Sequence, residues 1–220
     1  MPDLIFLDSN DFFINRPDKL EFLGQFTGES GPHLRARPNE GPLDLNRMSA
    51  EGHSNESNQM IPLVVNMTVP NKADFAVETG KSYSVEGELI RLEGEDTITF
   101  HIERGVNNRA IEGPELVDLG PIRVSGIGTI HKVLFVYRNA DQSLWQLDVE
   151  HEHRGAQEDS IRVRYLIPVE DLDVPFNTVF CLGSRIYLGG HIVSLGFGEA
   201  VMTVQVTAGA YFEQGCRESF

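Results

Sequence analysis

The chain has 220 residues, and its acidic residues outnumber its basic ones by 33 to 18, which gives a net charge of −15. A chain of this length forms one large domain or two small ones, with enough buried surface for a stable core. The charge argues against a protein that binds duplex DNA or an anionic membrane, because neutralising phosphates takes lysine and arginine. No run of about 18 apolar residues occurs, so we expect no transmembrane helix.

Residues 1–60 differ in composition from the rest of the chain. An apolar start that includes Leu4–Leu7 is followed by residues 27–60, which are rich in Gly, Pro, Ser, Asn and Glu. Such a stretch buries too little apolar surface to offset its ordering entropy. We therefore predict an N-terminal arm over 1–60: an apolar strand that docks on its own domain or on a partner, then a largely disordered linker.

Two further features bear on the compartment. The N-terminus has no basic region ahead of its apolar stretch, so it does not resemble a secretory signal. Cys181 and Cys216 are too few for a disulfide framework and are expected to be idle thiols. Together these features predict an intracellular protein, cytoplasmic or nuclear.

From Ile61 onward the pattern becomes a series of short runs with β-branched residues and period-two alternation. No window shows a helical stripe. We predict an all-β domain over 61–213, an antiparallel barrel or sandwich with OB-like or jelly-roll-like hairpins. Residues 214–220 are expected to be a tail.

The alternation also predicts strand registers. In the first hairpin, Tyr83–Ile90 with Thr97–Glu103, it sets Leu89 opposite Ile98 and Gly87 opposite Phe100. A three-stranded meander is expected over Ile130–Arg138, Leu144–His153 and Ile161–Ile167. Its register sets Val149 opposite Val163, and it pairs Asp148 with Arg164 and Glu150 with Arg162 on a face that we expect to be solvated.

The hairpin over residues 80–105 resembles the last one, over residues 183–209. Six positions coincide: Gly80, Gly87, Leu89, Leu92, Thr99 and Gly105 match Gly183, Gly190, Ile192, Leu195, Thr203 and Gly209. Two similar β-rich halves, or one barrel whose first and last hairpins look alike, would both produce this pattern.

The run Tyr83-x-Val85-x-Gly87-x-Leu89 with its following strand resembles the opening hairpin of an OB barrel, and so does the run from Ile186. The resemblance implies binding of single-stranded nucleic acid through aromatic and basic residues. However, the expected outer faces carry many carboxylates, so charge disfavours nucleic acid as a partner. The candidate binding residues are Arg104, Arg109, Arg123, Lys132 and Phe176.

Three histidines form a candidate metal site. His151 and His153 are two apart on one strand, and the predicted register sets His131 opposite His151. Three imidazoles could hold Zn²⁺ or another divalent metal with one position open for water. This spacing is similar to the metal cradle of α-type carbonic anhydrases, and His151-x-His153-x4-Glu158 is similar to half of a cupin motif. The alternative is a set of histidines hydrogen-bonded locally at the solvent rim.

The sequence contains no nucleophile elbow, P-loop, HExxH or paired CxxC motif. We therefore predict a non-enzymatic, acidic β domain without a cofactor that acts as a protein-interaction or self-assembly module, with a protein partner or a homo-oligomer. Two alternatives stay open. One is an OB-type binder of single-stranded nucleic acid, and the other is a metal-dependent β-barrel enzyme that uses the histidines.

Overall fold

A computed structural model describes residues 4–6, 18–37, 41–53, 60–70, 77–91, 97–102, 109–111, 121–137, 143–152, 160–169, 180–196 and 200–211, without the side chains of 4–6, 31–44, 53, 70, 109–111 and 211. The described part is built of strands. Their bounds are β1 Leu4–Phe6, β2 Leu20–Arg37, β3 Gly41–His53, β4 Met60–Pro70, β5 Ser82–Arg91, β6 Ile98–His101, β7 Arg109–Ile111, β8 Arg123–Val136, β9 Leu144–His151, β10 Ile161–Pro168, β11 Arg185–Leu195 and β12 Met202–Tyr211. No helix in these ranges is long and apolar enough to cross a membrane.

The strands close into two five-stranded barrels. In barrel 1 the pairing runs β2–β3–β4–β6–β5 and returns to β2, and in barrel 2 it runs β8–β9–β10–β12–β11 and returns to β8. In each barrel the third and fifth strands pair parallel, while the other neighbours pair antiparallel. This connectivity is that of the OB fold, so the predicted all-β fold with OB-like hairpins is confirmed. The two matching hairpins are the fourth and fifth strands of their barrels, not the opening ones.

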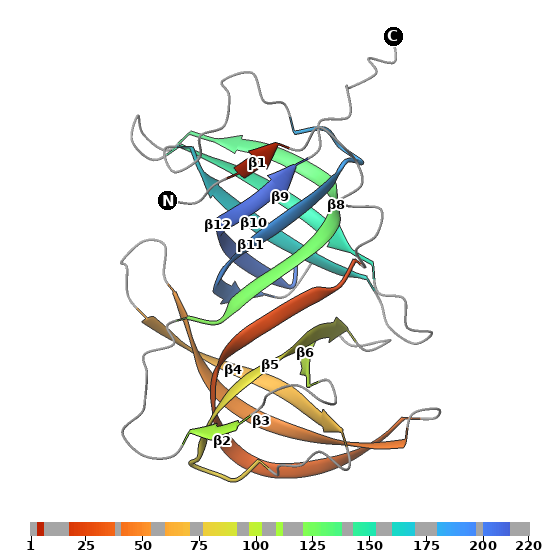
Figure 1. The fold of residues 1–220 in the computed structure, drawn as a ribbon, viewed down its shortest axis with the longest axis vertical. Helices are drawn as coiled ribbons and strands as arrows, with labels where there is room; N and C mark the ends of the chain where they lie inside the picture. The colour runs from red at the N-terminus through yellow and green to blue at the C-terminus, as the bar shows by residue number, and fades with distance from the viewer. Residues whose placement is uncertain are drawn as a thin grey trace.

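The barrels are stacked end to end and share a strand pairing (Figure 1). At the junction β2 runs antiparallel to β8, with Leu20 opposite Gly126 and Leu23 opposite Arg123. The sheet therefore continues from one barrel into the other, and the buried apolar side chains of both form one connected cluster.

The internal repeat corresponds to the two barrels, because both build the turn before the fourth strand in the same way. The Gly80 N–H donates to the Gly28 carbonyl and the Gly28 N–H to Lys81, and likewise Gly183 donates to Ile130 and Ile130 to Ser184, all at 2.8–3.0 Å. Gly80 and Gly183 both have φ of +80°, a conformation that favours glycine. The alternative of two similar halves is thus the one that the structure adopts.

The structure differs from the expected N-terminal arm. Residues 27–37 and 41–53, which we expected to be linker, lie in β2 and β3, and the boundary expected after residue 60 falls inside β4 of barrel 1. Few apolar residues suffice, because Met48 and Ala50 are buried in the barrel core while partner strands satisfy the backbone. The apolar start lies in β1, which pairs parallel with β12 of the same chain.

The register of the first predicted hairpin is wrong by two residues. Leu89 lies opposite Phe100 and Arg91 opposite Ile98. Both registers place the same side chains in the core, so alternation alone could not separate them. The meander register is confirmed for β9 and β10, including Val149 opposite Val163 and Asp148 opposite Arg164.

The expectation of idle thiols is also wrong for Cys181, which is disulfide-bonded. Cys216 and the rest of the predicted tail, 214–220, lie outside the described residues. The chain contains no other cysteine.

Candidate functional site

An aromatic surface, made of Phe135, Tyr137 and Trp145, lies where β8 ends and β9 begins, beyond the core of barrel 2. Phe135 pairs with Trp145 across the two strands, with ring centroids 4.9 Å apart at 64°. Because alternate residues share a face, these rings continue the face on which Leu147 is fully buried. They lie past the end of the barrel, so Phe135 stays 50% exposed and Tyr137 70% exposed.

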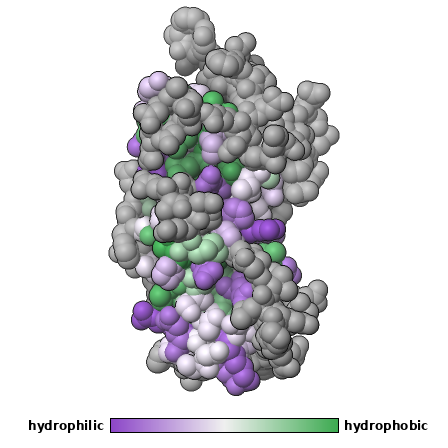
Figure 2. Space-filling model, turned by 90° about the vertical axis from the view of Figure 1, so that its left-hand side faces the viewer, coloured by the Kyte–Doolittle hydropathy of each residue, from purple (hydrophilic) through white to green (hydrophobic). Residues whose placement is uncertain are grey.

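The aromatic surface packs on a buried ring, and two exposed apolar side chains lie in neighbouring connections. Trp145 packs edge-on against Phe180, which is buried, at 5.6 Å. Two exposed apolar side chains lie in the neighbouring connections, Leu182 in the turn before β11 and Val169 after β10, whose N–H donates to the Ser143 carbonyl at 3.1 Å. In Figure 2, hydrophobic side chains lie in patches over the upper half and middle of the molecule, whereas hydrophilic ones dominate the lower end.

Two carboxylates on β9 lie on the outer face of the same barrel, beside cations of the flanking strands. Asp148 is 1% exposed and accepts two hydrogen bonds from the Arg164 guanidinium, at 2.9 and 3.2 Å. Lys132 of β8 lies opposite Asp148 on the other side and is exposed. This bidentate geometry makes the pair stronger than an exposed ion pair.

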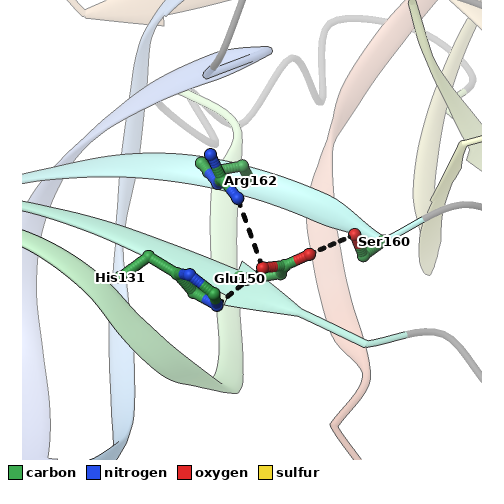
Figure 3. Close-up of polar contacts among 4 residues, drawn as sticks. All are labelled: His131, Glu150, Ser160 and Arg162. Carbon is green, nitrogen blue, oxygen red and sulfur yellow. Dashed lines mark hydrogen bonds and ion pairs between the residues drawn. The ribbon is translucent and has the colours of Figure 1, made fainter. Parts of the chain in front are cut away.

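Glu150 is the second of these carboxylates, and Figure 3 shows it between three polar partners. Ser160 donates a hydrogen bond to one carboxylate oxygen, while His131 lies 2.6 Å and Arg162 3.4 Å from the other. The Ser160 hydrogen bond, and the charges of His131 and Arg162 after it, hold the pKa of Glu150 below its usual value. Glu150 therefore stays ionised near neutral pH, with its charge balanced by neighbours.

The expectation of a solvated acidic face is wrong at Asp148, which is buried beneath Arg164. Glu150 is only 20% exposed, whereas the side chains of Arg162 and Arg164 are 36% and 34% exposed. Among these four residues the arginines are therefore more exposed than the carboxylates, whereas Glu152, two residues beyond Glu150, is exposed.

The predicted register that set His131 opposite His151 is also wrong. A bulge at His131 shifts the pairing, so Ile130 lies opposite Val149 and Lys132 opposite Asp148. His131 therefore points to Glu150 on the outer face, while His151 is buried in the barrel.

Both ring nitrogens of His151 are engaged. Its Nδ1 lies 2.9 Å from the Ile127 carbonyl oxygen, which can only accept, so Nδ1 carries the proton. Its Nε2 then accepts from the Tyr165 hydroxyl, also at 2.9 Å. Burial lowers the pKa of His151 to about 4 and raises that of Tyr165, so the imidazole is neutral and the phenol protonated. The metal site stays a prediction, since His153 lies outside the described residues.

The predicted basic residues are not brought together where they are described. Arg123 begins β8 at the junction, while Lys132 lies up to ~30 Å further along the same strand. Arg109 lies in β7, opposite Ser84, and its side chain is outside the described part, as are Arg104 and Phe176.

A groove of about 450 Å³ lies between the barrels, beside Arg123. Its charged lining is dominated by Glu21, Glu86 and Glu88, and Lys19 pairs with Glu88 at 3.3 Å. Its acidic lining repels phosphate, so the groove is a poor place for a nucleic-acid backbone.

Comparison with known proteins bears on the fold. No protein-family model and no curated protein matches the chain. Among solved structures, it is similar to the wild-type single-stranded DNA binding protein from Thermus aquaticus, with a TM-score of 0.59 and 16% identity over 92% of this chain and 96% of that one. A deletion mutant of the same protein gives 0.59 and 14% identity over 92% and 97%.

This likeness contradicts the expected function. The chain was predicted to be a protein-interaction or self-assembly module, with nucleic acid disfavoured, yet these two solved chains, which match over 92% of it, are single-stranded DNA binding proteins. The charge argument counted Asp148 and Glu150 as part of an exposed face, whereas Asp148 is buried and both lie against arginines. Sequence reasoning also missed the aromatic surface, since Phe135, Tyr137 and Trp145 continue a face that is buried further along both strands and alternation alone does not set them apart from the core. The sequence signal that could have revealed this surface is the position of the three aromatic residues beside the Asn- and Asp-rich connection 139–143.

At identities this low, the comparison shows the fold, which is a tandem pair of OB barrels.

Proposed function

We propose that the chain binds single-stranded nucleic acid, with single-stranded DNA as the first candidate. The observation that carries the proposal is the two-barrel OB architecture, similar over 92% of the chain to a single-stranded DNA binding protein. OB barrels bind oligonucleotides across their second and third strands and the adjoining connections. In barrel 2 these strands are β9 and β10.

The aromatic surface fits this ligand. Phe135 and Tyr137 are exposed beside the connection from the first to the second strand of barrel 2, and Trp145 packs between Phe135 and Phe180. Every nucleobase has an apolar face that stacks on such rings, whereas in a duplex these faces are stacked on one another. The surface therefore favours single strands over duplexes.

The local charge permits a backbone to approach barrel 2. Asp148 and Glu150 are paired, and Arg162, Arg164 and Lys132 lie around them on the outer face. Few cations are involved, so few counterions are released on binding. We therefore expect a shallower dependence of affinity on salt than a strongly basic binder shows.

Trp145 is the chain's single tryptophan and lies in the aromatic surface, so its fluorescence tests the proposal directly. Titration with an oligodeoxythymidylate at moderate salt should quench it with saturation, because stacking perturbs the indole. A duplex of the same length and a matched polyanion such as heparin serve as controls and should leave it unchanged. Flat traces with single strands of every base composition would refute the proposed function.

An intracellular location is part of this proposal, since such a ligand forms inside cells. The disulfide at Cys181 gives that location a test, because disulfides are rare in reducing compartments. Protein isolated with its thiols blocked should show free cysteine if the chain resides there.

A further inference from the structure

The two barrels are related by a local two-fold axis. Phe22 pairs with Gly87 in barrel 1, and Val124 pairs with Gly190 in barrel 2, so Phe22 and Val124 hold equivalent positions. These two residues also lie opposite each other where β2 and β8 pair antiparallel. Equivalent strands that pair antiparallel at equivalent residues are exchanged by a two-fold rotation. Figure 1 shows the result, because β2 and β8 leave the junction toward opposite ends of the molecule.

The axis matters for a directional ligand. A single strand runs from 5′ to 3′, and a two-fold rotation reverses the direction in which a surface meets it. A strand that crosses both barrels without turning back would contact one barrel in one sense and the other in the opposite sense. A continuous strand that does not turn back therefore cannot make the same contacts with both barrels.

The two barrels also differ in the aromatic side chains that they carry at equivalent positions. Ile130 and Val149 form the pair equivalent to Gly28 and Met48, as their shared turn contacts show. Four residues along the second strand from that pair, barrel 2 has Trp145 opposite Phe135. Barrel 1 has Asp44 opposite Leu34 at the matching place, and Ala36 matches Tyr137.

The described aromatic side chains of barrel 1 are buried and therefore cannot stack on nucleobases. Its phenylalanine and tyrosine side chains are at most 3% exposed and form its core: Phe22, Phe26, Tyr83 and Phe100. Three of them pack on one another edge-on, with ring centroids 4.8–5.7 Å apart. Among the described side chains, the exposed aromatic ones belong to barrel 2.

We infer that bases stack on barrel 2 alone: Phe135, Tyr137 and Trp145 hold a short single strand whose length fits one barrel, and barrel 1 makes no stacking contact. This inference rests on the proposed function. One OB barrel covers roughly 4–16 nucleotides, so affinity should stop rising steeply beyond about that length.

Matched variants of the full chain test the inference by fluorescence anisotropy with labelled oligodeoxythymidylates. Phe135→Ala with Tyr137→Ala removes the exposed rings, and Leu34→Ala with Asp44→Ala changes the matching place in barrel 1. We expect the first to weaken binding roughly 100-fold and the second less than about three-fold, because each stacked base contributes from about five-fold to more than 100-fold. Phe135→Tyr with Tyr137→Phe keeps both rings and should keep the affinity, and urea midpoints check that all variants are folded.

A polarity test adds an independent measurement. A strand of about 30 nucleotides with a central 3′–3′ or 5′–5′ linkage presents the two halves in opposite directions, which would suit two barrels related by a two-fold axis. If only barrel 2 stacks bases, neither linkage binds tighter than the continuous strand. Markedly tighter binding, or equal losses from the barrel 1 and barrel 2 variants, would overturn the inference. Failure of the unmodified chain to bind any single strand would instead refute the proposed function.

Discussion

Barrel 1 and barrel 2 share the glycines that shape their backbones and differ in the side chains at equivalent positions. Both use a glycine at φ of +80° before the fourth strand and a second glycine where that strand meets the fifth. At equivalent places on the second strand, however, barrel 1 has Ala50 where barrel 2 has His151, and Arg47 where barrel 2 has Asp148. The comparison teaches that the positions where backbones approach closely define the fold, while the remaining positions are free to diverge in function.

The largest loss of stability should come from substituting the two glycines at which neighbouring backbones approach closely. A methyl group added at Gly190 would overlap the Gln205 carbonyl oxygen, and one at Gly87 would overlap that of His101. We expect Gly190→Ala and Gly87→Ala each to cost about 3 kcal/mol in the free energy of unfolding, because backbone must move. Urea denaturation followed by circular dichroism measures this.

Gly189→Ala is the matched control, since its nearest neighbour would be the Ser125 Cβ at 3.4 Å. It should cost much less than Gly190→Ala. A large loss at Gly190 with none at Gly87 would show that the barrels are not equivalent at this place.

Next in size is the ion pair that each barrel makes on its second strand. Asp148→Asn removes a buried carboxylate from Arg164 and should cost about 2–3 kcal/mol, because a charged hydrogen bond is lost from a desolvated site. Glu29→Gln breaks the pair with Arg47, whose side chain is 62% exposed, and should cost under about 1 kcal/mol. Equal losses in urea denaturation would contradict the contrast between the two faces.

Acid should destabilise barrel 2 through His151. Its pKa is about 4 in the folded protein against 6.5 ordinarily, so the unfolded chain binds the proton more readily between these values. Stability is therefore full above about pH 6.5 and falls as the pH drops, by about 2 kcal/mol at pH 5 and about 3 kcal/mol near pH 4.

Urea midpoints at pH 7 and pH 5 check this, and His151→Gln, which hydrogen-bonds without titrating, should remove most of the difference. Keeping the lower point at pH 5 leaves the carboxylates, including Glu150 with its lowered pKa, ionised. An unchanged pH dependence in the variant would show that other groups carry it.

Among the changes made at matching places in both barrels, substitution of the two turn glycines should have the smallest effect on stability, and that effect should be equal in both. Gly80 and Gly183 have φ of +80°, and nothing lies within 4 Å of a Cβ added at either. Gly80→Ala and Gly183→Ala should therefore cost about 1 kcal/mol each, from backbone strain alone. Asn tolerates this conformation better, so Gly→Asn should cost less at both sites. Unequal losses would mean that the two turns are held differently.

Beyond residue 60 the sequence alone determined that the chain forms strands, which side chains of β5 and β6 face the core, and the pairing of β9 with β10, because alternation and opposite charges act between neighbours along the chain. Position-by-position similarity also revealed the repeated glycines at 80 and 183 and at 87 and 190. These are local signals, so a single sequence suffices to see them.

Only the tertiary structure decided the rest. Residues 27–37 and 41–53 became strands because distant partners supply their hydrogen bonds, which composition does not record. His131 and His151 separated because one bulged residue reverses the face of a strand. Phe135 became exposed and Trp145 only half-buried because the barrel ends before the strands do. Where a core ends depends on how all the strands pack, which no local pattern contains.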